Sequence, residues 1–165
     1  MNKILSAKHW QIFVFLMIGL FIGNLKIENE PTLTVILTII GILAYSIYPL
    51  LVGHFLQDYL PRRMELNHNL FLINVFIWIS VYSVIMVLSD GKGMTFNGII
   101  ALPFLYVFYA LLYSLAFPAK TLKSIELNKK ASFGEYFVDF ILIIFLPIGI
   151  WVLQPRINKI VKSEE

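Results

Sequence analysis

Long apolar runs, broken by short polar stretches, dominate the chain. Five such runs cover residues about 10–25, 33–56, 70–88, 98–117 and 137–153. Because about 20 apolar residues are needed to cross the hydrocarbon core of a membrane, the first four runs are interpreted as transmembrane helices. The predicted fold is an all-α integral membrane protein, a bundle of four transmembrane helices plus a fifth segment broken by Pro and Gly.

The fifth run differs from the others. Asp139 interrupts it and leaves 14 unbroken apolar residues, a length more typical of a re-entrant or interfacial piece. Pro147 and Gly149 stand near its middle, where a chain is able to reverse if other helices cover the exposed backbone. Two interpretations stay open, a re-entrant segment and a short, kinked fifth span.

Polar and helix-breaking residues separate the runs. Glu28–Pro31 divides the first from the second, and Pro31 suits the first turn of the next helix. Asp90–Gly93 is a tight-turn pattern after the third run. Pro118 is expected to end the fourth helix.

The placement of Lys and Arg predicts orientation. With a re-entrant fifth segment, 11 of the 13 Lys and Arg residues lie on the side of the N-terminus and 2 on the other side. With five full spans the division is 8 to 5. Because cytoplasmic loops carry an excess of positive residues, the first arrangement is favoured, with both ends of the chain in the cytoplasm.

Composition supports a membrane protein and excludes several classes of site. The chain has 165 residues, 59% of them hydrophobic and only 14% charged, whereas soluble domains carry about 25% charged residues. We therefore expect one membrane domain, residues 1–165, with the lipid bilayer as its main partner and no nucleic acid. The absence of cysteine excludes disulfides, thiolate metal sites and cysteine nucleophiles.

Three sets of polar side chains lie inside the apolar runs at helical spacing. The set in the second run consists of Thr34, Thr38, Gly41, Tyr45 and Tyr48. The sets in the third and fourth runs consist of Asn74, Trp78 and Tyr82, and of Tyr106, Tyr109 and Tyr113. Polar groups without partners are costly in hydrocarbon, so we expect these faces to meet inside the bundle, either as a polar path or ligand pocket or as ordinary interhelical packing.

Gly19 and Gly23 form a GxxxG pattern in the first run, which permits close helix approach within one chain or in a dimer. Glu135 and Asp139, one helical turn apart at the start of the fifth run, are candidate functional residues because ionisable groups in membrane segments are often functional. The alternative is an anchor, in which Asp139 pairs with Arg156 or bonds Gln154.

Ionisable residues of both signs are expected to form one layer at the cytoplasmic end. They are His9, His54, His68, Asp58, Arg62, Arg63, Glu126, Glu135, Asp139 and Arg156. The three histidines lack the spacing of zinc motifs, so interfacial residues are favoured over a metal or proton-handling site. No catalytic motif of the nucleophile-elbow, phosphate-loop or dinucleotide kind is present, and no cofactor is predicted.

Residues 145–158 (FLPIGIWVLQPRIN), 89–98 (SDGKGMTFNG) and 117–126 (FPAKTLKSIE) resemble stretches of small uncharacterised membrane proteins from Bacteroidetes-type bacteria. The resemblance covers about half of the chain. It implies a multi-pass protein of the bacterial inner membrane and brings no activity.

Three functions are left open. The first is a non-enzymatic protein that acts through helix packing with itself, as a homo-oligomer, or with a membrane partner. The second is a small transporter or channel that uses the polar stripes with Glu135 and Asp139. An enzyme embedded in the membrane ranks last, because no catalytic set is present.

Overall fold

The computed structural model describes residues 5–61 and 63–163, and within these residues the chain forms only helices and the turns that join them. The α-helices are α1 (His9–Gly23), α2 (Pro31–Phe55), α3 (His68–Leu88), α4 (Leu102–Leu127), α5 (Phe133–Ile144) and α6 (Leu146–Ser163). Two short 3-10 turns, η1 (Leu56–Tyr59) and η2 (Gly98–Ala101), follow α2 and precede α4. The expected all-α class is confirmed.

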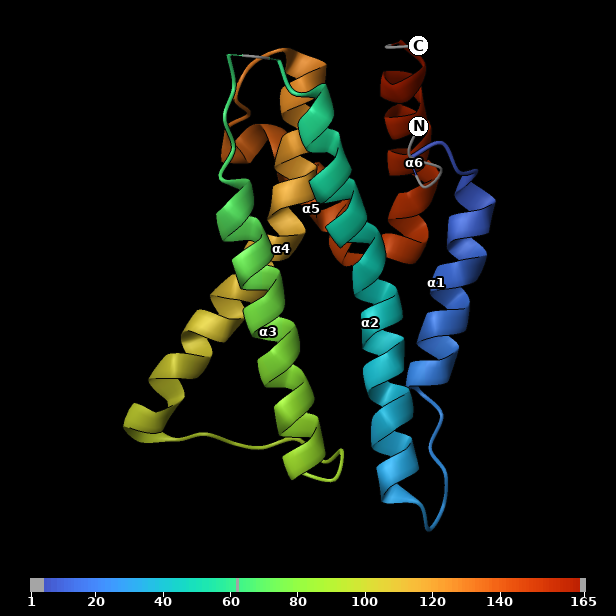
Figure 1. Cartoon of the computed structure of the whole chain (residues 1–165), viewed down its shortest axis with the longest axis vertical. Helices are drawn as coiled ribbons and strands as arrows, with labels where there is room; N and C mark the ends of the chain where they lie inside the picture. Colours follow the sequence, from blue (N-terminus) through green and yellow to red (C-terminus); the bar gives the residue numbers. More distant parts are fainter. Residues whose placement is uncertain (1–4, 62, 164–165) are drawn as a thin grey trace.

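The long helices α2, α3 and α4 form the body of the molecule, and α1 lies beside α2 (Figure 1). The short helices α5 and α6 form a hairpin, in which α5 contacts α4 and α6 contacts α1. The described parts nearest to the two ends of the chain lie at the same end of the molecule. The N-terminal half of α4 leans away from the other helices.

Three helical stretches are long and apolar enough to cross a membrane: Pro31–Tyr59, His68–Leu88 and Gly98–Leu127. The fourth expected span, α1, is apolar but has only 15 residues. At about 1.5 Å per residue it is about 22 Å long, shorter than a hydrocarbon core of about 30 Å. Three of the four expected spanning helices are thus found, and the first apolar run forms a shorter helix.

Pro118 does not end the fourth helix, which is a correction to the sequence-based expectation. It lies inside α4, which continues to Leu127. Pro118 has no N–H to donate to Ser114, so the helix loses one bond there. Its neighbour Phe117 is 4% exposed and stacks on Phe71 of α3 at a centroid distance of 4.4 Å. This packing holds the helix together across the proline.

The other helix ends follow their local sequences. Pro31 stands at the start of α2, and the side chain of Asn67 accepts a bond from the backbone N–H of Leu70 at the start of α3. Asn128 ends α4 with φ 52°, the left-handed conformation that asparagine tolerates. The predicted turn after the third run is present, with Asp90 at φ 50°.

The GxxxG pattern is used within the chain, for the contact between α1 and α2. A Cβ atom at Gly41 of α2 would lie 2.3 Å from Cα of Gly23, and one at Gly19 would lie 2.9 Å from Cβ of Ala44. The helices therefore touch backbone to backbone, which only small residues permit. Of the two interpretations of the pattern, close packing inside the monomer is the one observed.

The fifth run reverses direction between α5 and α6, at Phe145. The hydroxyl of Tyr45, on α2, donates to the carbonyl of Ile144 at 2.9 Å and accepts from the N–H of Leu146 at 3.2 Å. At Gly149 a Cβ atom would lie 1.9 Å from the carbonyl oxygen of Leu142, so the two helices cross with no room for a side chain. The chain thus reverses its direction close to Pro147 and Gly149, where a reversal was expected to be possible.

We predict that Gly41→Ala lowers the free energy of unfolding by about 1–3 kcal/mol, because backbone atoms of α1 block the added methyl group. Unfolding in mixed micelles, followed by circular dichroism, measures the loss. Gly134→Ala is the matched control, since Gly134 lies in α5 with no atom within 4 Å of an added Cβ. Equal stability of the two variants would contradict the close contact.

Candidate functional site

The polar face of α2 points toward α1 and α6. The hydroxyl of Thr38 donates to the carbonyls of Thr34 and Gly23. The hydroxyl of Tyr48 donates to the side-chain oxygen of Gln154 at 2.8 Å, in the buried core. Tyr45 bonds the turn between α5 and α6. Apart from the bond within α2, these bonds join α2 to α1, to α6 and to the turn, and none of them goes to α3 or α4.

Two of the three polar residues expected to be shielded in α3, Asn74 and Trp78, are buried, and the third, Tyr82, is half-buried. Asn74 is 0% exposed and Trp78 7% exposed. The side-chain oxygen of Asn74 accepts a bond from the hydroxyl of Tyr106 at 3.0 Å. The side-chain N–H groups of Asn74 and Trp78 have no hydrogen-bond partner among the described residues.

The tyrosines of α4 behave differently from the prediction. Tyr106 and Tyr109 are 45% and 49% exposed, and Tyr113 is half-buried. Because the first half of α4 leans away from the bundle, its aromatic rings follow one another along the helix surface rather than facing α2. The expectation that Tyr106 and Tyr109 are shielded is therefore wrong.

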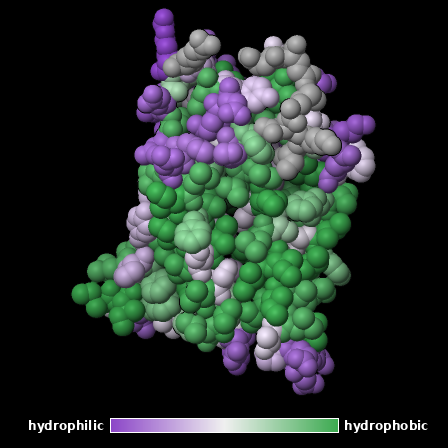
Figure 2. Space-filling view, in the orientation of Figure 1, coloured by the Kyte–Doolittle hydropathy of each residue, from purple (hydrophilic) through white to green (hydrophobic). Residues whose placement is uncertain are grey.

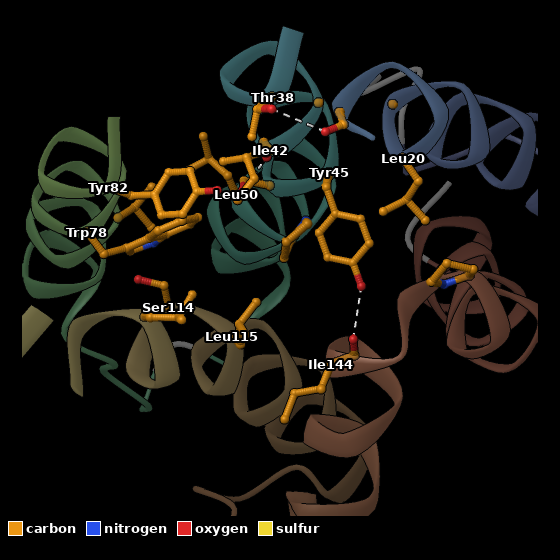
Figure 3. Close-up of a pocket in the computed structure, with 18 of the residues that line it drawn as sticks. Leu20, Thr38, Ile42, Tyr45, Leu50, Trp78, Tyr82, Ser114, Leu115 and Ile144 are labelled. Atoms are coloured by element: carbon orange, nitrogen blue, oxygen red, sulfur yellow. Dashed lines mark hydrogen bonds between the residues drawn. The ribbon is translucent and has the colours of Figure 1, made fainter. Parts of the chain in front are cut away.

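A cavity of about 670 Å³ lies between α1, α2, α3 and α4, against the turn that joins α5 to α6 (Figure 3). Trp78 and Tyr82 face it from α3, and Ser114 and Leu115 face it from α4. Its other described lining residues are Gly19, Leu20, Gly23, Asn24, Thr38, Gly41, Ile42, Tyr45, Ser46, Pro49, Leu50, Val75, Leu111, Ile144, Phe145 and Pro147. None of these lining residues is Asp, Glu, Lys, Arg or His.

Most polar groups in the wall are already paired. The hydroxyl of Ser46 donates to the carbonyl of Ile42 at 2.7 Å, and that of Ser114 to the carbonyl of Ala110 at 2.6 Å. The hydroxyl of Tyr45 is held by the turn. With the hydroxyls of Thr38, Tyr45, Ser46 and Ser114 directed at backbone carbonyls, the cavity presents mainly carbon to any molecule inside it, and the N–H of Trp78, unpartnered among the described residues, is a donor in its wall. This surface suits an apolar ligand and offers neither a nucleophile with its base nor a charged group.

Sequence reasoning found part of this cavity. Thr38, Gly41 and Tyr45 of the second-run set line it together with Trp78 and Tyr82 of the third-run set, as the alternative of a ligand pocket required. Ser46 and Ser114 were missed, because each stands alone in an apolar run and a small residue there is also typical of packing.

Charged residues gather at the end of the molecule where both ends of the chain lie, and the flank is apolar (Figure 2). Arg156 of α6 is the centre of an ion-pair cluster there. Its guanidinium donates to Asp139 of α5, and two of its nitrogens donate to Glu126 of α4, each at 2.6 Å. Lys123 adds a second cation to Glu126 at 3.5 Å. The expected pair of Asp139 and Arg156 is present, and Glu126 joins it.

This cluster ties three helices together. Asp139 is 4% exposed, so its charge depends on the guanidinium for compensation. Hydrogen bonds to Asp139 and then Glu126 raise the pKa of Arg156 above its ordinary value. Gln154 does not bond Asp139. It is 0% exposed, and its amide donates to the carbonyls of Leu5 and Ala7.

Glu135 forms a separate cluster at the start of α5. Its carboxylate accepts bonds from the backbone and hydroxyl of Ser132 and pairs with Lys129 at 2.6 Å. The bond from Lys129, followed by those from Ser132, lowers the pKa of Glu135 to about 2. Glu135 is thus engaged in capping a helix.

Two of the three histidines meet. Nδ1 of His54 and Nε2 of His68 are 2.9 Å apart, where α2 ends and α3 begins. His9 instead lies against Trp151, with ring centroids 4.6 Å apart. Within residues 5–61 and 63–163, no group of three His, Asp or Glu side chains is arranged to hold a metal ion. Arg62, expected in the same layer, lies outside the described residues.

The fold defines the class of the protein: it is helical, and three of its helices are long and apolar enough to cross a membrane. An apolar cavity lies among its helices. Comparison with known proteins found no matching protein-family model, no matching curated protein and no matching solved structure. The function proposed for the chain therefore depends on its own geometry.

We predict that Arg156→Gln lowers the free energy of unfolding by about 3 kcal/mol, because it leaves the carboxylate of Asp139 buried without a cation. The double variant Asp139→Asn/Arg156→Gln should lose less, since no buried charge remains at position 139. Unfolding in mixed micelles gives both values.

Lys159→Gln, at an exposed position on α6 without a described ion pair, is the control and should change stability by less than about 0.5 kcal/mol. A double variant that is less stable than Arg156→Gln alone would show that Asp139 does not depend on the guanidinium.

Proposed function

We propose that the chain is a multi-pass protein of the bacterial inner membrane, with its N-terminal and C-terminal segments in the cytoplasm and α5–α6 as a re-entrant hairpin. The division of Lys and Arg, 11 against 2, supports this orientation. The shared end of α1 and α6 and the apolar flank of the molecule are consistent with it. Tyr45 bonds the backbone at the reversal, as a turn within a membrane requires.

Within that membrane, the protein is a non-enzymatic binding protein for an apolar, lipid-like molecule. The cavity between α1, α2, α3, α4 and the α5–α6 turn carries this proposal. Its volume of about 670 Å³ falls in the range of ligand pockets, about 300–1,000 Å³. Its serine hydroxyls bond backbone carbonyls, so an apolar molecule inside leaves those groups with their partners.

The same geometry disfavours ion transport through this cavity. None of the described residues lining it carries a formal charge, and Asp139, which was the candidate for that role, faces Arg156 instead. Glu135, the other candidate, caps α5. An ion crossing the bundle by this route would lose its hydration without receiving a compensating charge.

The orientation predicts which engineered cysteines react with a reagent that cannot cross membranes. Because the chain has no cysteine, Lys92→Cys and Lys162→Cys each introduce a single thiol. In intact cells of an expression host, a membrane-impermeant maleimide should label Lys92→Cys and spare Lys162→Cys until the cells are opened. Labelling of Lys162→Cys in intact cells would place the C-terminal segment outside.

Trp78 provides a reporter for the cavity. With Trp10→Phe and Trp151→Phe, the fluorescence of the chain comes from Trp78 alone, because there are three tryptophans. Titration of this variant in detergent with bromododecane, an apolar quencher, should give saturable quenching. Adding Ser46→Leu and Ser114→Leu fills the cavity and should weaken binding about fivefold or more, the equivalent of one or two excluded CH₂ groups.

Ser83→Leu is the matched control, because Ser83 also bonds the carbonyl four residues earlier but does not line the cavity. Quenching that never saturates, or that is the same in the filled variant and the control, would mean that the quencher reaches Trp78 from the micelle and that the cavity binds nothing.

A further inference from the structure

A second, smaller cavity of about 180 Å³ lies on the other side of α4, toward the charged end of the molecule. Four segments build it: the residues before α3, one face of α4, the connection after α4, and the first turn of α5. Its lining residues are Leu66, Asn67, Tyr113, Ala116, Phe117, Lys120, Lys130 and Tyr136. The four from α4 share a face because they are three or four positions apart.

The polar groups of this cavity are all able to donate hydrogen bonds. Lys120 and Lys130 contribute ammonium groups, and Tyr113 and Tyr136 contribute hydroxyls. The side-chain oxygen of Asn67 accepts from the N–H of Leu70, which leaves its NH₂ group as a donor. No carboxylate lines the cavity among the described residues.

Three carboxylates close to these lysines in sequence or in the fold are engaged with other cations. Arg156 binds Glu126 and Asp139, and Lys129 binds Glu135. Glu65, on the segment before α3, lines a neighbouring groove and makes no ion pair with another described residue. Lys120 and Lys130 thus line one small cavity, and neither forms an ion pair with another described residue, so their like charges repel and a bound anion would relieve this repulsion.

We propose that this cavity binds a phosphate group, either in the headgroup of an anionic phospholipid or as a free phosphate ion. Two ammonium groups and several neutral donors, with no acceptor carboxylate, match the charge and the oxygen acceptors of phosphate. The proposal is independent of the apolar ligand, because the two cavities share no lining residue.

Binding to the purified full chain in a non-ionic detergent tests the site. The probes are phosphatidylglycerol and phosphatidylcholine, followed by native mass spectrometry, and inorganic phosphate, followed by calorimetry. We expect one tightly bound anion per chain. Lys120→Gln/Lys130→Gln should weaken its binding about tenfold or more, as the loss of two charge-assisted bonds implies.

Competition between inorganic phosphate and phosphatidylglycerol shows whether the bound phosphate group belongs to a lipid headgroup or to a free ion. A preference for phosphatidylglycerol over phosphatidylcholine that inorganic phosphate does not reduce identifies the lipid headgroup. Binding of inorganic phosphate that also displaces the lipid identifies the free ion. Either result supports the site, provided that the double lysine variant loses it.

Lys159→Gln/Lys162→Gln removes the same charge from exposed positions of α6 and should leave binding unchanged. Tyr113→Phe/Tyr136→Phe removes two donors without altering charge, should weaken binding several-fold, and covers the case in which the lysine variant does not fold. The proposal is overturned if wild type binds neither probe, if both lysine variants bind alike, or if the tyrosine variant binds as wild type does.

Discussion

A single tyrosine hydroxyl makes the arrangement of the C-terminal third possible. Where α5 ends and α6 begins, the chain leaves a carbonyl and an N–H without helical partners, and Tyr45 of α2 bonds both. Away from water, such groups cost about 1–3 kcal/mol or more each if unpaired. The reversal therefore needs α2 beside it, and the crossing at Gly149, where no side chain fits, brings α6 back along α5. The reversal places Arg156 between the carboxylates of Glu126 and Asp139. It also places Ile144, Phe145 and Pro147 against the apolar cavity.

The molecule separates its polar groups into two kinds of environment. Along the long helices, serine and threonine hydroxyls bond backbone carbonyls of their own helix or a neighbour, so the space between the helices stays apolar. At one end, charged side chains pair across helices and hold α4, α5 and α6 together. The close contact of α1 and α2 at Gly41 forms part of the cavity wall, whereas the ion pairs of Arg156 involve no residue that lines the cavity.

Local sequence was sufficient to predict the helices, the reversal near Pro147 and the pairing of Asp139 with Arg156, because each depends on apolar run length or on a charge that lipid cannot solvate. It failed where tertiary contacts decide. The helix α4 continues past Pro118, where Phe117 stacks on Phe71. The first half of α4 is tilted away from the other helices, so Tyr106 is exposed. The spacing within the second and third runs indicated five residues of the larger cavity, but both cavities take side chains from four or more segments, so no single segment defines them.

The bonds from Gln154 to the carbonyls of Leu5 and Ala7 join residues about 150 positions apart. During synthesis, the segment that precedes α1 is made well before its partner, because α1 to α5 lie between the two. This contact has a high contact order and forms only after the long helices have been made. Until α6 is present, the carbonyls of Leu5 and Ala7 lack the amide of Gln154, so α6 completes a contact that begins with the segment before α1.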